Sequence, residues 1–308
     1  MTLEITPPIS IAKAYSPSHI TGFYSEVKDE SILNRGSLGA GISIRKGVSS
    51  TVEVYDSEQN NFIISINGVT SPDAIVSRFV INEFLKKANK NYFLKISHKV
   101  EVPIGYGIGT SGSAALSLSY AINDALSLGL SDTESAQIAH KAEIECKTGL
   151  GTVLSEFYGG LCIRTQGGAP GIGKTSVIKV NNRKVAIFCF SPIFTRYFIE
   201  TIRKISNNEC SYMMMKVLQT KKIADFLHLS CKFSQSLGFL NKTCNNLIDN
   251  LMQNGIQSSA ALFGQTVFTI INENELEIVR KISKNIPARL FISDVENEGA
   301  RLLTKHDT

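Results

Sequence analysis

Residues 103–115 constrain the fold more than any other stretch, because glycines and hydroxyl side chains are concentrated there directly before a run of small residues typical of a helix. The segment reads PIGYGIGTSGSAA. Glycines let the backbone approach an anion closely and turn its amide groups toward it. The following helix would point its positive dipole end at the same place. The hydroxyl groups of Thr110, Ser111 and Ser113 can bind phosphate oxygens or Mg²⁺. The segment therefore predicts a phosphate-binding loop; the alternative is a simple turn before a helix.

Two shorter patterns also suggest phosphate binding, but neither fits its surroundings. Gly168 to Thr175 matches the P-loop pattern GxxxxGK[ST], yet a P-loop needs a helix directly after its lysine. Residues 176–190 instead resemble a β-hairpin with a turn at residues 181–183. Residues 107–112 match the dinucleotide fingerprint GxGxxG, but two helices follow instead of a helix and a strand. We interpret the first pattern as a glycine-rich connection between strands and reject a nicotinamide or flavin site at the second.

The pattern along the chain predicts a mixed α and β protein that changes character near residues 180–195. A chain of 308 residues with 43% hydrophobic residues is long and apolar enough for about two domains. A capping box, Ser131 to Glu134, marks the start of one helix. We expect strands at residues 11–15, 40–45, 51–55, 62–66, 92–102, 159–165, 176–190, 267–271 and 289–292, and helices at residues 71–87, 111–128, 131–147 and 273–283 and over most of 195–254.

Four further segments, in the right order, complete a resemblance to a known family. The loop resembles the PxxxGLGSSAA motif of the GHMP small-molecule kinases. Residues 14–23, AYSPSHITGF, resemble the substrate segment of that superfamily and are most similar to the PGHITGF of archaeal pantoate kinases. Residues 36–41 and 148–151 also resemble those kinases, and residues 259–268 fall where the C-terminal glycine motif is expected. The similarity spans nearly the whole chain.

The resemblance implies the fold, the reaction and the cofactors. The implied fold is α+β, with a ribosomal-protein-S5-domain-2-like N-terminal domain over residues 1–185 and a ferredoxin-like C-terminal domain over residues 186–308. The implied reaction transfers the γ-phosphoryl group of ATP, with Mg²⁺, to the hydroxyl of pantoate, giving 4-phosphopantoate for coenzyme A synthesis. The alternatives are another hydroxy acid, such as homoserine or mevalonate, and a nucleotide-binding regulator without catalysis.

The resemblance also assigns roles to individual residues. Ser111 would contact a phosphate oxygen or Mg²⁺. Glu143 is the expected carboxylate partner of the metal, although the helical periodicity alone does not separate it from Glu145. His19 and Arg164 would bind the substrate, Arg164 by gripping its carboxylate. ATP would contact Pro103, Gly105, Gly107, Gly109, Thr110, Ser111, Gly112 and Ser113.

Thr152 is a departure from the resemblance. Pantoate kinases usually have an aspartate here, often regarded as a catalytic base, and Thr152 is the catalytic candidate that stands in its place. General-base catalysis increases a reaction rate by about 10²- to 10⁴-fold. Homoserine kinases of the same superfamily also lack this carboxylate. Three interpretations remain, in order of preference: phosphate oxygen or solvent takes the proton, Glu156 replaces the aspartate, or activity has been lost.

Charge and cysteine content bear on partners and location. The net charge of +5 comes with no basic stripe interleaved with aromatic residues. We therefore expect a small-molecule substrate and no nucleic-acid or membrane partner, and a homodimer is left open. The six cysteines form no CxxC pair, so a structural zinc site is not expected. Reduced core cysteines and no signal pattern in residues 1–10 predict a cytoplasmic protein.

Overall fold

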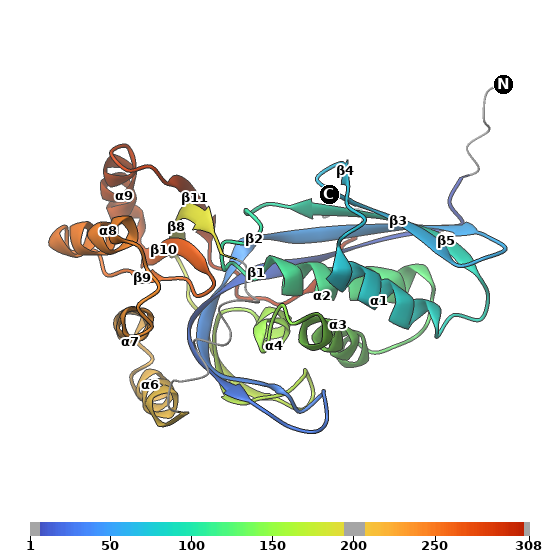
Figure 1. The fold of residues 1–308 in the computed structure, drawn as a ribbon, viewed down its shortest axis with the longest axis horizontal. Helices are drawn as coiled ribbons and strands as arrows, with labels where there is room; N and C mark the ends of the chain where they lie inside the picture. The colour runs from blue at the N-terminus through green and yellow to red at the C-terminus, as the bar shows by residue number, and fades with distance from the viewer. Residues whose placement is uncertain (1–6, 194–206, 305–308) are drawn as a thin grey trace.

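The computed structural model describes residues 7–193 and 207–304, and its strands form two sheets. The larger sheet has eight strands in the order β12-β1-β2-β5-β3-β4, and β6 pairs with both β2 and β7. It spans the right side of Figure 1. All the pairings in it are antiparallel except that of β3 with β5. The strands are β1 (Ser10–Val27), β2 (Gly36–Asp56), β3 (Asn61–Ile66), β4 (Val69–Thr70), β5 (Tyr92–Val100), β6 (Leu161–Gln166), β7 (Lys174–Ile178) and β12 (Arg301–Leu302).

Four helices lie against one face of this sheet, as Figure 1 shows. They are α1 (Ile75–Leu85), α2 (Thr110–Ala125), α3 (Asp132–Cys146) and α4 (Thr152–Tyr158). Their apolar sides pack with β2 and β5 in one cluster of buried residues, which includes Phe84, Leu94 and Leu116. The capping box predicted at Ser131 is present, because its hydroxyl accepts from the backbone of Glu134 while the Glu134 carboxylate accepts from the backbone of Ser131.

The second sheet has four antiparallel strands in the order β11-β8-β10-β9, and some of the later helices pack against it. The strands are β8 (Lys184–Pro192), β9 (Ser259–Ala260), β10 (Gly264–Ile271) and β11 (Arg289–Asp294). The helices are α6 (Asn207–Thr220), α7 (Ile223–Ser236), α8 (Lys242–Gln253), the short 3₁₀ turn η1 (Glu273–Glu275) and α9 (Leu276–Ser283). The part of the predicted helical region that falls in residues 194–206 lies outside the described residues.

The β-hairpin predicted over residues 176–190 is wrong. The strand β7 pairs with β6 in the larger sheet, whereas β8 pairs with β10 and β11 in the smaller one. Alternation shows that a residue is extended, but it does not identify the strand that is its partner. Both faces of β8 are buried, with Val185 and Ile187 in one cluster and Ala186 and Phe188 in another. That double burial holds β8 in the middle of its own sheet.

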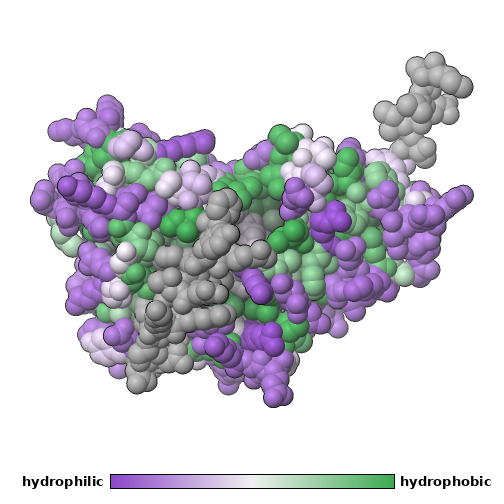
Figure 2. Space-filling model, in the orientation of Figure 1, coloured by the Kyte–Doolittle hydropathy of each residue, from purple (hydrophilic) through white to green (hydrophobic). Residues whose placement is uncertain are grey.

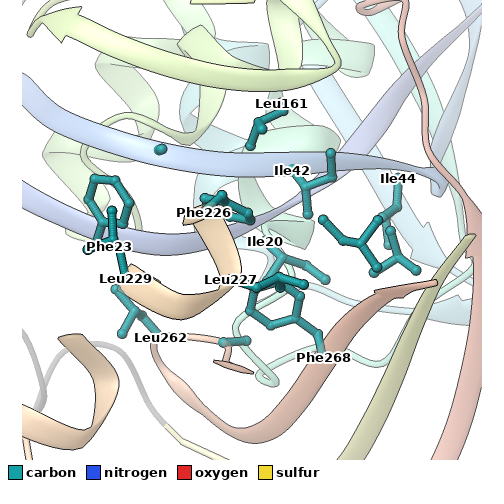
Figure 3. Packing of buried hydrophobic residues seen from close by; sticks show 14 of the residues in the cluster. Ile20, Phe23, Ile42, Ile44, Leu161, Phe226, Leu227, Leu229, Leu262 and Phe268 are labelled. Atoms are coloured by element: carbon teal, nitrogen blue, oxygen red, sulfur yellow. The ribbon is translucent and has the colours of Figure 1, made fainter. Parts of the chain in front are cut away.

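A third cluster of hydrophobic residues joins the two sheets. In Figure 3, Ile20, Phe23 and Ile42 from the larger sheet point toward Phe226 of α7 and Phe268 of β10. The Phe226 ring centroid lies 6.3 Å from those of both Phe23 and Phe268. This shared core fixes one half of the chain against the other. On the surface, Figure 2 shows hydrophobic residues near the middle of the molecule. The division into domains at residue 185 stays a prediction. The strand β12 follows that residue in the sequence but pairs with β1 in the larger sheet.

Within the described residues, no helix is long and apolar enough to cross a membrane. Four of the six cysteines, Cys162, Cys189, Cys210 and Cys244, are buried, and all six are free thiols. This agrees with their interpretation as small core residues.

Two of the buried histidines, His98 and His140, illustrate how the stability of this fold depends on pH. Burial lowers the pKa of both His98 and His140 to about 4. The His98 ring lies between the hydroxyls of Ser50, at 2.8 Å, and Ser77, at 3.0 Å, which satisfy a neutral imidazole. An unfolded chain takes up protons on histidine near pH 6.5. Between about pH 6.5 and 4 the unfolded state therefore binds more protons, and each buried histidine destabilises the fold as the pH falls.

We expect the free energy of unfolding of the native protein, relative to that of His98→Asn, to fall by about 2 kcal/mol between pH 7 and pH 5. Denaturant titrations of both proteins at the two pH values measure it. The difference between the proteins cancels the opposite contribution of the buried carboxyl groups Glu143 and Glu156, whose pKa values burial raises. A pH-independent difference would show that the His98 imidazole accepts a proton inside the folded protein.

Candidate active site

The glycine-rich segment forms a loop that enters α2 directly, as a phosphate-binding loop requires. Gly107 and Gly109 have φ angles of 73° and 70°, in the left-handed region that favours glycine. Gly109 is the N-cap of α2, whose first residues are Thr110 and Ser111. The amide groups of this first turn have no partner within the helix, and the helix dipole adds positive potential there. The geometry is therefore that of an anion site, and we call residues 103–112 the phosphate loop.

A cavity of about 750 Å³ borders the phosphate loop. It lies between the two sheets, since its wall includes Tyr24 of β1 as well as Leu262 and Phe263 of the segment that joins β9 to β10. The predicted site residues that line it are His19, Gly105, Gly107, Gly109, Thr110, Ser111, Thr152 and Arg164. Pro103, Gly112, Ser113 and Glu143 are not part of its wall, and their expected contacts with ATP or metal stay predictions.

The segment between β9 and β10 fixes the phosphate loop from the side of the smaller sheet. A Cβ atom on Gly107 would collide with the carbonyl oxygen of Leu262, and one on Gly264 would collide with the carbonyl oxygen of Tyr106. These backbones can approach so closely only because both residues are glycines. The phosphate loop is therefore clamped between the two halves of the chain.

One carboxylate next to the phosphate loop is buried with half of its hydrogen-bonding capacity unused. The Thr148 hydroxyl donates to Glu143 Oε1 at 2.6 Å, while Glu143 Oε2 has no hydrogen-bond partner among the described residues. Burial raises the pKa of Glu143, and hydrogen bonds from Thr148 and Ser111 oppose that rise. Glu145, which the periodicity left open, is exposed. The unpaired Oε2 belongs to a carboxyl group whose pKa the Ser111 hydroxyl also influences. It fits a magnesium ion, which prefers oxygen ligands and takes several from bound phosphates.

A buried arginine faces the same cavity, and it has no acidic partner among residues 7–193 and 207–304. Arg164, on β6 opposite Gly39 of β2, is 1% exposed. Its Nη1 donates to the Ser155 hydroxyl at 2.8 Å and approaches His19 Nε2 at 3.5 Å, and its Nε has no partner among the described residues. Burial lowers the pKa of this guanidinium. A buried cation with neutral neighbours and a free donor is the arrangement that an incoming carboxylate would complete.

The His19 side chain occupies space that a glycine leaves open. His19 on β1 pairs with Ser43 on β2, and its Nδ1 lies 3.3 Å from the Ser43 hydroxyl. A Cβ on Gly41 would collide with the His19 ring. Burial, followed by the charge of Arg164, lowers the pKa of His19, so the ring is neutral. Because Arg164 can only donate, His19 Nε2 accepts from it and Nδ1 carries the proton toward Ser43.

Comparisons with known proteins show which family the chain belongs to. Residues 74–160 match the family model described as the GHMP kinases N terminal domain. The chain is 31% identical over 274 residues to the pantoate kinase of Methanocaldococcus jannaschii, covering 88% of this chain and 97% of that protein. The chain belongs to the pantoate kinase family.

Solved structures extend the likeness to the whole fold. A phosphotransferase related to the CoA biosynthesis pathway superposes with a TM-score of 0.86 at 24% identity, covering 95% of this chain and 98% of the other. Mevalonate diphosphate decarboxylase from Enterococcus faecalis, solved with mevalonate diphosphate, AMPPCP and magnesium, superposes with a TM-score of 0.75 at 14% identity, covering 96% and 99%. The predicted α+β GHMP kinase fold is confirmed.

Thr152 remains the point at which this member of the pantoate kinase family lacks an expected carboxylate. It is the first residue of α4 and lies in the cavity wall. Glu156, one turn further along α4, is fully buried and does not line the cavity. Its carboxyl group faces Ser113, at 2.9 Å from the hydroxyl. In this geometry Glu156 does not reach a substrate hydroxyl, which weakens the idea that it replaces the missing base.

Sequence reasoning missed the residues that hold the functional side chains in place. Ser155 supports Arg164 and Ser43 supports His19, and both contacts join different elements of the fold. Neither serine belongs to a motif. Thr148, which donates to Glu143, lies in the Thr148 to Gly151 segment already noted for its resemblance, so its position could have been inferred.

Proposed function

We propose that the chain phosphorylates the hydroxyl group of pantoate with ATP and Mg²⁺, giving 4-phosphopantoate and ADP. The observation that carries the proposal is the buried Arg164, whose Nε has no hydrogen-bond partner among the described residues, facing the same cavity as the phosphate loop. Family membership and the likeness to a CoA-pathway phosphotransferase support the same reaction. A substrate with a carboxylate and a hydroxyl group to be phosphorylated matches a cavity with a buried cation beside an anion-binding helix end.

Different residues of the site would bind the phosphates, the metal and the substrate carboxylate. The loop amides and the Thr110 and Ser111 hydroxyls would hold the phosphates of ATP, while Arg164 would hold the pantoate carboxylate. Glu143 and Ser111 would hold Mg²⁺, which neutralises phosphate charge when it is bound. The pantoate oxygen forms the new bond to the γ-phosphorus as the bond to ADP breaks. Because the transition state is loose, alignment and charge do most of the work.

The hydroxyl proton must leave without an aspartate at position 152. In a loose transition state the attacking oxygen loses its proton late, so a transferred phosphate oxygen or solvent can accept it. Glu156 does not line the cavity, so direct proton transfer to its carboxyl group has no open path. We therefore propose that Thr152 lines the site and that phosphate oxygen or solvent takes the proton.

A substrate panel tests the proposal. Purified protein with MgATP should release ADP in the presence of pantoate, and the product should be identified as 4-phosphopantoate by mass spectrometry. Turnover only with homoserine or mevalonate would reject pantoate as the substrate. ATP binding without turnover on any hydroxy acid would point to a nucleotide-binding regulator. We also propose a cytoplasmic location, where ATP is available. A homodimer is the oligomeric state that we would test, and light scattering measures it.

We expect His19→Ala to raise the KM for pantoate by about tenfold, corresponding to about 1.4 kcal/mol, with a smaller change in kcat. The variant removes the acceptor that faces Arg164 Nη1, so the guanidinium loses part of its orientation. Initial rates over a pantoate series at saturating MgATP measure the effect. An unchanged KM would remove His19 from the substrate site.

A further inference from the structure

The hydroxyl group of Ser113 has more acceptors around it than it can serve. It lies 2.8 Å from the Pro17 carbonyl oxygen, 3.0 Å from the Gly109 carbonyl oxygen and 2.9 Å from Glu156 Oε1. A serine hydroxyl has one hydrogen to donate, and the two carbonyl groups can only accept. A fourth neighbour, the Ser18 hydroxyl, lies further away at 3.5 Å. Of the three closer neighbours, only a carboxyl group that keeps its proton can donate to Ser113. The Gly109 carbonyl already accepts from the backbone amide of Ser113. The remaining contacts are satisfied together when Glu156 donates to Ser113 and Ser113 donates to the Pro17 carbonyl.

The surroundings of Glu156 also disfavour a charged carboxylate. The side chain is fully buried, and its Oε2 has no hydrogen-bond partner among the described residues. No lysine or arginine of the described residues forms an ion pair with it, and Glu143 is the charged group whose field acts on it. Burial and that negative charge both raise the pKa of Glu156, and the contact with the Ser113 hydroxyl opposes that rise. A buried, unpaired carboxylate is costly, so the neutral form prevails.

The Glu156 carboxyl group also lies against the phosphate loop, next to Gly109 and Gly112. A Cβ on Gly109 would lie 2.8 Å from Glu156 Oε1, and a Cβ on Gly112 would lie 2.7 Å from Oε2. Both glycines therefore leave the space that the carboxyl group fills. Through Ser113, the same group is linked to Pro17 on β1, two residues before His19. The Glu156 carboxyl group thus packs against the loop without lining the cavity.

We propose that Glu156 is a positioning residue: its proton-bearing carboxyl group donates to Ser113 and holds the phosphate loop in the shape that binds ATP. The inference rests on the proposed function, since it concerns the loop of the same site. It gives Glu156 a role different from that of a base that would replace the missing aspartate.

Three substitutions test the role. Glu156→Gln keeps the shape and offers an amide donor to Ser113, so kcat and the dissociation constant of MgATP should stay within about threefold of the native values, and the shape of the kcat–pH profile should not change. Glu156→Ala and Ser113→Ala should each weaken MgATP binding at least tenfold, as measured by calorimetry, with the KM for pantoate nearly unchanged. Ser119→Ala is the matched control, because Ser119 is a buried serine of the same helix with an unpaired hydroxyl; it should leave MgATP binding unchanged.

Two outcomes would overturn the inference. One is a loss of kcat of a hundredfold or more in Glu156→Gln with MgATP binding retained, which would make Glu156 a base. The other is unchanged MgATP binding in both alanine variants. Infrared difference spectra of native protein against Glu156→Gln at pH 7 test the protonation without any substrate. They should show the carbonyl band of a protonated carboxylic acid, and its absence would contradict the proposal even if the substrate proved not to be pantoate.

Discussion

Replacing Arg164 by methionine is expected to raise the KM for pantoate at least a hundredfold while the affinity for MgATP stays within about twofold. Methionine fills much of the same volume but has no charge and no donors. Charge-assisted hydrogen bonds to a carboxylate are worth about 1.5–3 kcal/mol each, and a hundredfold change corresponds to about 2.7 kcal/mol. Steady-state kinetics in pantoate and calorimetry with MgATP measure the two quantities.

The same substitution should make the unliganded protein more stable. Arg164 is buried, its Nε is unpaired and no carboxylate among the described residues compensates its charge. Removing such a cation relieves a desolvation cost, and replacing buried charges by apolar residues is often stabilising by about 1–4 kcal/mol. We expect the free energy of unfolding to rise by about 1 kcal/mol, because the lost hydrogen bond to Ser155 offsets part of the gain.

If Arg164→Met raises both the KM for pantoate and the free energy of unfolding, Arg164 serves substrate binding and not the stability of the fold. Arg78→Met is the control, since Arg78 is exposed on α1 and does not line the cavity; it should change neither quantity. A destabilised Arg164→Met with normal pantoate kinetics would instead make Arg164 a structural residue of β6.

The local parts of this fold follow from the sequence because short-range physical chemistry determines them. The capping box at Ser131 starts α3 through hydrogen bonds within four residues. The small residues after Gly109 form α2, and the strand after Lys174 excludes a P-loop there. The strands β1 and β2 run far beyond the predicted short segments. Their serines and glycines are weak strand formers, but burial on both faces keeps them extended.

The contacts that shape the site depend on distant parts of the chain and could not be predicted. Nothing local indicates that Ser155 will meet Arg164 or that Glu156 will lie under Gly109 and Gly112. Both require α4 to pack between α2 and β6. The backbone of Phe263, which has a φ angle of 67° and lines the cavity, is another case. Aromatic residues rarely adopt this conformation, so only the surrounding structure can impose it.

The acidic side of the site is tested by Glu143→Gln, for which we expect kcat to fall about 10³-fold, or about 4 kcal/mol of activation free energy. Glutamine keeps the size of the side chain and can still accept from Thr148 Oγ1, so the fold should be retained. It cannot supply the negative charge that balances a divalent cation next to a triphosphate. The concentration of Mg²⁺ needed for half-maximal rate should therefore rise together with the loss of kcat.

Glu145→Gln is the matched control because Glu145 belongs to the same helix, is exposed and is the alternative that helical periodicity left open. It should leave kcat and the Mg²⁺ dependence within about twofold of the native values. In the native protein Glu143 is buried, and its Oε2 has no partner among the described residues. Burying an uncompensated carboxylate lowers the stability of the fold, and a bound cation would offset that loss. If Glu143→Gln retains its Mg²⁺ dependence while Glu145→Gln loses it, the metal is held on the exposed face of α3 and the buried carboxylate has another role.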